Sequence, residues 1–377
     1  MTTTAAAPGA ATIPPPKSVN IAITGKCNLK CRYCFYANEM EGLKDLPTAA
    51  WLRLFDQLGE IGVRDSCISG GEPFIRPDFF DLLDGMIANR LRYSVLSNGT
   101  LIDEKLLQRF ETGKRRLRLD YIQVSIDGSN AAIHNQSRPG SFDRALRGLR
   151  LLKEAKFPTN VRVTITRHNL DDLENIAKLL LEDVGLKSFG TNESMPLGSG
   201  CRSDADMSLS APEKLKAMAT IGRLQRRYPG RLNAAAGPHS KRKTYGEMAS
   251  AFRRGEKTAH WMGTLNSCGC IFNRCDVLHD GAIVPCCMLP TLVMGNIQRD
   301  SLLDIWRHHP TLRALRERRR IPMNEVPGCE SCSFTPYCNG GCPGLAHALT
   351  GEVNRANPED CLRTFLRETG SGRDLLG

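Results

Sequence analysis

The sequence predicts an α/β fold with parallel strands, followed by a smaller cysteine-rich unit. Runs rich in β-branched residues alternate six times with amphipathic runs from Val19 onward, and this alternation implies parallel strands joined by right-handed crossovers. Ten of the 15 cysteines fall in the last third of the 377 residues, at spacings typical of metal ligands. A chain of this length can bury one large domain and a smaller one.

Each expected strand precedes a polar or glycine-rich segment, and each expected helix has apolar residues three and four positions apart. Because active sites in such sheets lie at the carboxyl ends of the strands, these segments are expected to meet at one edge. The expected strands are Val19–Thr24, Ser66–Ser69, Tyr93–Ser97, Tyr121–Ile126, Val161–Thr166 and Ser188–Asn192. The expected helices include Thr48–Ile61, Phe79–Asn89, Phe142–Ala155 and Leu173–Leu181.

The composition indicates a soluble globular protein, with 41% hydrophobic and 24% charged residues. No apolar run approaches the roughly 20 residues that a membrane span needs. Residues 1–17, expected as a flexible tail, lack the features of a signal peptide. We therefore expect a cytoplasmic protein with reduced thiols and no membrane partner. The net charge of +11 is spread out without a nucleic-acid-binding motif, which favours solvated helix faces, or a dock for an acidic peptide or redox partner, over nucleic acid.

Three cysteines directly after the first expected strand form the strongest motif. Cys27, Cys31 and Cys34 have the spacing C-x3-C-x2-C. A structural zinc site needs four closed ligands, usually in two pairs, and the sequence has no fourth ligand nearby. Three thiolates on one tight loop instead suit a 4Fe–4S cluster with one iron left open for a small molecule, with a zinc knuckle as the alternative.

With Tyr33 before its last cysteine, this loop resembles the signature of the radical S-adenosylmethionine (SAM) enzymes. The resemblance implies a partial (β/α)6 barrel, here over residues 18–227, with the cluster loop after the first strand. It also implies that the open iron chelates the amino and carboxylate groups of SAM. One electron, from a donor such as flavodoxin or ferredoxin, would then cleave SAM to methionine and a 5′-deoxyadenosyl radical, which abstracts a hydrogen atom from the substrate.

A second motif, Gly70-Gly71-Glu72-Pro73, follows the second strand. Glycines let the backbone approach a ligand closely, and Glu72 can accept a hydrogen bond from a cationic amine. The tetrapeptide resembles the family motif whose backbone carbonyls hold the SAM ammonium group, with a plain turn as the alternative. The resemblance also places polar residues of later strand ends beside SAM, where capping of turns is the other interpretation. These further residues are Asn98, which would line the site, Ser125, Asp127 at the ribose, and Arg167 at the SAM carboxylate.

Three further residues near the same edge are candidates for catalysis. By the resemblance, Arg138 orients substrate or SAM, with a surface salt bridge as the alternative. Glu193 follows the sixth strand and faces either the barrel mouth or away from it. Cys201 follows a glycine-rich loop at the same rim. Beyond these residues, the basic stretch 228–265 is expected to link the two domains.

The last third of the chain resembles the SPASM extension of radical SAM enzymes, named for subtilosin, pyrroloquinoline quinone, anaerobic sulfatase and mycofactocin maturation. The shared pattern is C-x(9–15)-G-x4-C, then C-x2-C-x5-C-x3-C and a final C, and every spacing from Cys286 onward fits it. The resemblance implies a domain over residues 266–377 with two auxiliary iron–sulfur clusters, expected to be 4Fe–4S, where two zinc sites are the alternative. Cys329, Cys332, Cys338 and Cys361 would hold the outer cluster, and Cys286 and Cys342 the inner one, with two more ligands from Cys268, Cys270 and Cys275.

Cys287 stands where sulfatase-maturating enzymes have an aspartate, the proposed catalytic base. Sulfatase maturation therefore ranks below other peptide modifications. A thiol near the radical could donate a hydrogen atom, as peptide epimerases require, so Cys287 and Cys201 are the candidate donors. An inert buried thiol or an alternative cluster ligand is the other interpretation of each.

We therefore expect an enzyme that modifies a ribosomally made peptide or small protein by crosslinking, thioether formation, epimerisation or oxidation. A separate leader-peptide-binding protein, or the enzyme's own surface, would recognise this substrate, because too few residues precede the first strand for a leader-binding domain. The alternatives are a sulfatase-maturase-like enzyme, a small-molecule dehydrogenase with a SPASM domain, and a non-catalytic iron–sulfur electron carrier. A carrier would not need the motifs around Gly70 and Ser125.

Overall fold

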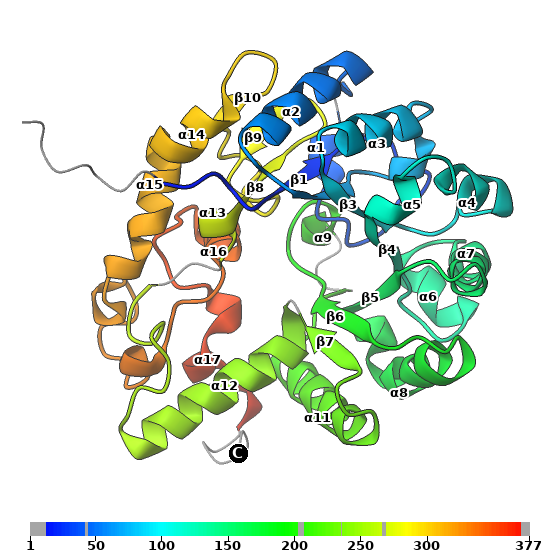
Figure 1. The fold of residues 1–377 in the computed structure, drawn as a ribbon. Helices are drawn as coiled ribbons and strands as arrows, with labels where there is room; N and C mark the ends of the chain where they lie inside the picture. Colours follow the sequence, from blue (N-terminus) through cyan, green and yellow to red (C-terminus); the bar gives the residue numbers. More distant parts are fainter. Residues whose placement is uncertain (1–12, 42–43, 203–206, 235, 266–268, 371–377) are drawn as a thin grey trace, which may run out of the picture.

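The computed structural model describes residues 13–41, 44–202, 207–234, 236–265 and 269–370. These residues form one curved ten-stranded sheet with helices packed outside it (Figure 1). The sheet order is β10-β9-β8-β1-β2-β3-β4-β5-β6-β7. The strands are β1 Ser18–Ala22, β2 Asp65–Ser69, β3 Arg92–Ser97, β4 Leu119–Ser125, β5 Thr159–Ile165, β6 Phe189–Glu193, β7 Leu232–Ala234, β8 Arg274–Val277, β9 Ala282–Val284 and β10 Gly295–Asn296.

Helices connect the parallel strands β1 to β7 and cover the outer face of the barrel (Figure 1). Their apolar faces pack on the sheet, and α2 alone buries five side chains. The helices up to β7 are α1 Ala37–Met40, α2 Thr48–Glu60, α3 Phe79–Ala88, α4 Glu104–Phe110, α5 Arg115–Arg118, α6 Ala131–Ser137, α7 Phe142–Glu154, α8 Leu173–Lys178, α9 Ser199–Arg202 and α11 Ala211–Arg227.

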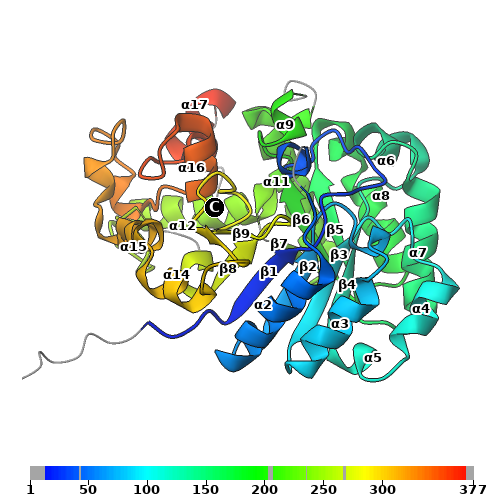
Figure 2. The ribbon, with the colours of Figure 1, turned by 90° about the horizontal axis from the view of Figure 1, so that it is seen from above.

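The C-terminal helices lie on the other side of β1 from the barrel helices (Figure 2). They are α12 Gly237–Arg254, α13 Cys270–Asn273, α14 Leu302–His308, α15 Pro310–Glu317, α16 Pro343–Thr350 and α17 Leu362–Thr369. Among the described residues, no helix is both long and apolar enough to cross a membrane.

The predicted α/β class and the six alternating units are confirmed. All six expected strands are present with their ends within a few residues of the expectation, and they pair in parallel in sequence order. The structure adds β7 to one edge of this series and β8 to the other. The stretch 228–265, expected as a linker, contains β7 and the 18-residue helix α12. The domain boundaries themselves stay a prediction.

Strand β8 joins the cysteine-rich part of the chain to the barrel sheet. It pairs in parallel with β1, and β9 then pairs with β8 in antiparallel fashion. In this register Asn20 faces Asp276, and the Asn20 amide donates to the Asp276 carboxylate at 3.0 Å. The two parts of the molecule therefore share one sheet.

A cluster of aromatic rings that includes residues of α3 and α4 stabilises the core of the barrel. The Phe110 ring is fully buried and packs edge-on against its neighbours, with ring centres 5.0 to 6.3 Å apart. Edge-on contacts of this kind are favourable beyond the burial of their apolar area. The neighbours are Phe74, Phe79, Phe80 and Phe157.

We expect Phe110→Ala to lower the free energy of unfolding by about 3–5 kcal/mol, because it removes a buried ring and leaves a cavity among four others. Urea unfolding followed by circular dichroism, under anaerobic conditions, measures this change. Leu117→Ala is the control, because the Leu117 side chain is 76% exposed and its removal should change stability by less than about 0.5 kcal/mol. Equal effects of the two substitutions would contradict the prediction.

Candidate active site

The loop that carries Cys27, Cys31 and Cys34 connects β1 to α1 and is anchored where it leaves the strand. The Thr24 hydroxyl donates to the Asp45 carboxylate at 2.6 Å, and the Gly25 N–H donates to the same carboxylate at 2.7 Å. These contacts fix the direction in which the cysteine loop starts.

The main chain of Gly70 and Gly71, after β2, packs directly on this loop. The Gly71 N–H donates to the Thr24 carbonyl at 2.7 Å, and the next N–H donates to the Lys26 carbonyl at 2.8 Å. A Cβ atom on Gly71 would lie 2.1 Å from the Lys26 carbonyl oxygen, and Gly70 has a φ of +135°. Both positions therefore require glycine.

The Glu72 carboxylate joins this motif to the end of β3. Ser97 donates its hydroxyl proton to Glu72 at 2.9 Å, and the Asn98 N–H donates to it at 2.7 Å. The Asn98 side-chain nitrogen in turn lies 2.8 Å from Asn28 Oδ1 and 4.0 Å from Cys27 Sγ. Burial raises the pKa of Glu72 from 4.5 to about 7. Pro73 is buried next to this carboxylate and begins a short 3-10 helix.

Arg138, at the end of α6, points its guanidinium at the second cysteine. Its Nη1 lies 3.7 Å from Cys31 Sγ, and its Nε donates to Asp127 Oδ2 at 2.5 Å. The guanidinium also lies over the Tyr33 ring, 5.3 Å from the ring centre, and the Tyr33 hydroxyl donates to Asp127. The Arg138 side chain is only 12% exposed. The structure thus places Arg138 in a buried ion pair beside a cysteine sulfur.

Asp127 is fully buried and surrounded by donors. Besides Arg138 and Tyr33, the Thr164 N–H donates to its carboxylate at 2.7 Å. The expected contact with the SAM ribose stays a prediction, and the observed partners make Asp127 the group that holds Arg138. Ser125 ends β4 nearby and is half-buried.

Arg167 and Cys201 lie on the rim of the barrel. Arg167 forms an ion pair with Glu213 of α11 at 2.9 Å, and its side chain is 44% exposed. Cys201 is exposed on α9, and its Sγ lies 2.9 Å from the Pro196 carbonyl oxygen. The same helix begins at Ser199, whose hydroxyl donates to the carbonyl of Cys31 at 3.0 Å.

Glu193, at the end of β6, is buried and paired with two lysines. Lys241 of α12 lies 2.9 Å from its carboxylate, and Lys214 of α11 lies 3.4 Å away. Lys214 also pairs with Glu359, and Lys241 lies 3.5 Å from Asp360. Asp360 precedes Cys361 in the chain, so this network connects the barrel rim to the second group of cysteines.

The thiols of Cys27, Cys31 and Cys34 are chemically suited to bind an iron–sulfur cluster. Burial raises the pKa of all three, that of Cys34 to about 11, and their closeness to one another adds to the effect on Cys34. Three buried thiolates therefore need a cation, and soft sulfur ligands select zinc or iron–sulfur centres. The N–H groups of Asn98 and Arg138 are directed at two of the sulfurs, as a bound thiolate requires.

The four cysteines expected at the outer auxiliary cluster lie together. Burial, together with the proximity of Cys329, Cys361 and Cys332, raises the pKa of Cys338 to about 11. This group is assembled from a loop and from the start of α17, segments separated along the chain. The donor set of four thiols is complete for one iron–sulfur cluster.

The cysteines expected at the inner cluster are only partly brought together. The thiols of Cys270 and Cys287 both hydrogen-bond to Cys286. Cys342 begins α16, and the packing of Gly344 against Met288 places this helix start beside the turn after Cys286. Cys275 lies on β8 and is 1% exposed. Cys268 lies outside the described residues.

Two family comparisons agree with these sites. Residues 21–180 match the radical SAM superfamily, and residues 268–333 match SPASM, an iron–sulfur cluster-binding domain. The chain is a radical SAM enzyme with a SPASM domain. Its cofactors are accordingly SAM, a 4Fe–4S cluster and auxiliary iron–sulfur centres. The cysteine loop and the Gly70–Pro73 motif both fall inside the first match.

Relatives of this radical SAM enzyme are named as heme synthases, as PqqA peptide cyclases and as a subtilosin biosynthesis protein. An AdoMet-dependent heme synthase of Methanosarcina barkeri is 29% identical over 91% of this chain and 95% of that protein. A PqqA peptide cyclase of Granulibacter bethesdensis is 26% identical over 92% of this chain and 87% of that protein. The subtilosin biosynthesis protein AlbA of Bacillus subtilis is 24% identical over 89% of this chain and 68% of that protein.

Solved structures share the fold of the enzyme. Streptococcus suis SuiB, bound to its precursor peptide SuiA, superimposes with a TM-score of 0.71 at 16% identity, over 93% of this chain and 76% of that one. The enzyme anSMEcpe with bound AdoMet gives a TM-score of 0.67 at 18% identity, over 94% and 96% of the two chains. Both matches cover more than nine tenths of this chain.

Sequence reasoning missed several side chains that shape these sites. Lys214 and Lys241, which pair with Glu193, come from helices that carry no motif. Asp276 lies within hydrogen-bond reach of the inner cysteines, and its position between apolar residues of an unexpected strand was the available signal. Tyr33 was identified from the sequence only as part of the cysteine signature, although its hydroxyl also donates to Asp127.

We expect Arg138→Met to make the midpoint potential of the SAM-binding cluster more negative. The positive charge and the N–H donor of Arg138 next to Cys31 stabilise the reduced cluster, and the substitution removes both groups. A redox titration followed by electron paramagnetic resonance measures the potential. Arg167→Met is the matched control, because Arg167 pairs with Glu213. An unchanged potential in Arg138→Met, at full iron content, would contradict this role.

The raised pKa of Glu72 predicts a pH-dependent contribution to stability. Its protonated form is favoured in the folded state, so the contribution is fully present below about pH 4.5 and is lost as the pH rises through about 7. The stability of the wild type relative to Glu72→Gln should fall by about 3 kcal/mol over this range. Urea unfolding of both proteins between pH 5 and 8, at equal iron content, measures the difference, and a difference independent of pH would disprove the interpretation.

Proposed function

We propose that this radical SAM enzyme modifies a peptide or small-protein substrate by hydrogen-atom abstraction. The observation that carries the proposal is the complete outer set of Cys329, Cys332, Cys338 and Cys361, gathered in one place. Small-molecule enzymes with a SPASM domain usually have a truncated extension with fewer cysteines. The names of the PqqA peptide cyclase and AlbA relatives support the same substrate class.

When bound, the cluster and SAM would supply the electron-transfer and radical chemistry, with the electron coming from an external donor, and the residues of the chain position them. Gly70 and Gly71 bring main-chain carbonyls to the edge where the SAM amino group binds. Glu72 holds the loop of Asn98 against Cys27. The distance between the cysteine loop and the strand end at which SAM would bind is thereby fixed. Arg138 holds a positive charge at Cys31.

A second candidate is an iron–porphyrin substrate. It is favoured by the heme synthases among the relatives, two of which are 29% and 28% identical over 95% and 89% of their own lengths. The chain is also strongly basic, with a net charge of +11, and a porphyrin that bears carboxylates is an anion. Relatives of both kinds match this chain over a similar span, so the peptide class is placed first because of the complete outer cysteine set.

We expect the anaerobically reconstituted enzyme to convert SAM to 5′-deoxyadenosine when dithionite supplies electrons. Replacement of Cys27, Cys31 and Cys34 by alanine should abolish this product, because no cluster can then bind SAM. Chromatography with mass spectrometry measures it. A non-catalytic electron carrier would make no 5′-deoxyadenosine in any form.

The substrate class is decided by offering two compounds to the same preparation. One is a short peptide encoded beside the gene for this enzyme, and the other is an iron–coproporphyrin. A mass change in the peptide alone supports the proposal, with flavodoxin or ferredoxin then tested as the physiological electron donor. A mass change in the porphyrin alone would overturn it in favour of the second candidate.

A further inference from the structure

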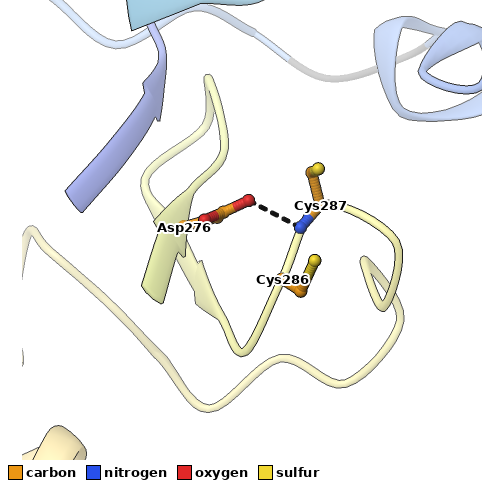
Figure 3. A group of neighbouring side chains, drawn as sticks. All are labelled: Asp276, Cys286 and Cys287. Atoms are coloured by element: carbon orange, nitrogen blue, oxygen red, sulfur yellow. Dashed lines mark hydrogen bonds between the residues drawn. The ribbon is translucent and has the colours of Figure 1, made fainter. Parts of the chain in front are cut away.

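A group of side chains of the types that bind metal ions lies where β8 and β9 meet the barrel sheet. Asp276 extends from β8 towards the turn after β9, which carries Cys286 and Cys287 (Figure 3). The Cys287 N–H donates to Asp276 Oδ2 at 2.7 Å, and Asn20 holds the other carboxylate oxygen at 3.0 Å. Asp276 is 3% exposed, so both carboxylate oxygens are fixed in the interior.

The distances within this group are short. The Sγ atoms of Cys286 and Cys287 and a carboxylate oxygen of Asp276 all lie within 4.8 Å of one another. Two thiolates on one tetrahedral metal ion are about 3.8 Å apart, given metal–sulfur bonds of about 2.3 Å. In a cubane each cysteine binds its own iron, which separates the sulfurs further. Two sulfurs this close therefore suit a shared metal ion.

Cys270 lies next to this group, because its thiol hydrogen-bonds to Cys286. Arg274, at the start of β8, is close enough for the charges of Asp276 and these cysteines to act on it. One guanidinium does not balance a carboxylate and three thiolates, so a bound cation is needed when the thiols are ionised.

Cys275 is directed away from this group. Side chains alternate across a strand, and β8 places Asp276 opposite Asn20 and Cys275 opposite Val19. Val19 and Cys275 therefore lie on the other face of the sheet from Asp276, and both are buried. The sequence pattern offers Cys275 as a ligand, but the strand turns its sulfur to the opposite side.

We propose that Cys286 and Cys287 bind the same iron of the inner auxiliary centre, with Cys270 beside them, and that Cys275 takes no part. Asp276 is the positioning residue, because it fixes the turn through the main-chain N–H of Cys287. Soft thiolates make iron–sulfur or zinc the suitable occupant, and the match to SPASM favours iron. The centre is then smaller than a cubane with four separately bound irons. Cys287, a neighbour of Tyr36, is thereby a ligand and no longer a candidate hydrogen-atom donor.

The test compares two single substitutions in a full-length background that lacks Cys27, Cys31 and Cys34, so that only the auxiliary centres are loaded. We expect Cys287→Ala to lose iron and sulfide and the Mössbauer signal of the inner centre. The matched Cys275→Ala, a neighbour of Asp276 on the opposite face, should keep both. Asp276→Asn should change the inner signal and leave the outer one unaltered. Full iron and an unaltered spectrum in Cys287→Ala, or an equal loss in Cys275→Ala, would overturn the proposal.

A second measurement needs no substitution of the site and so does not depend on how the variants fold. The loaded wild-type enzyme is treated with iodoacetamide before and after iron removal by a chelator, and labelled cysteines are mapped by mass spectrometry. Cys287 should be protected only when iron is bound, whereas the exposed Cys201 should be labelled in both states. Labelling of Cys287 in the loaded enzyme would refute the assignment. Both readouts are independent of the substrate, so their failure and the failure of the proposed function are distinguishable.

Discussion

The site depends on the close contact between the main chain after β2 and the cysteine loop after β1. Two N–H groups, of Gly71 and Glu72, donate to carbonyls of that loop at 2.7 and 2.8 Å. The contact is possible because a Cβ on Gly71 would overlap the Lys26 carbonyl, so only glycine permits it. Glu72 then carries the constraint to β3, where Asn98 reaches Cys27. Three neighbouring strand ends thus fix the positions of the cluster ligands before any cofactor binds.

The charged groups beside the cluster serve the chemistry more than the stability of the fold. Asp127 and Arg138 form a buried pair, and burying two charges costs about as much as their attraction returns. The pair is useful because Arg138 must remain directed at Cys31, where a positive charge stabilises an electron-rich cluster. Tyr33 and Thr164 complete the shell around Asp127, so the guanidinium has little freedom to move.

Local patterns predicted the strands, the helices and the ligand spacing, because these depend on neighbours in the sequence. The six strands and the triad at Cys27 needed only periodicity and cysteine counting. Contacts between distant segments had no such signal. Glu193 was recognised as a strand-end residue, but its lysines come from α11 and α12. Cys275 was one of three candidate upstream ligands, yet the alternation of β8 decides the direction of its side chain, and β8 was not expected as a strand.

The sharing of one sheet between the two iron–sulfur regions has a mechanical consequence. Because β8 pairs with β1, the inner auxiliary site lies on the strand next to the one that leads into the SAM loop. The Tyr36 hydroxyl, two residues after the last triad cysteine, lies 2.8 Å from the ring of His279, two residues after β8. The separation of these two sites is therefore set by backbone hydrogen bonds within a sheet. The outer cluster is attached differently, through apolar side chains packed on α11 and α12 and through ion pairs such as Lys241 with Asp360. The inner site and the SAM-binding cysteine loop are therefore expected to move as one unit, because a paired strand holds them together.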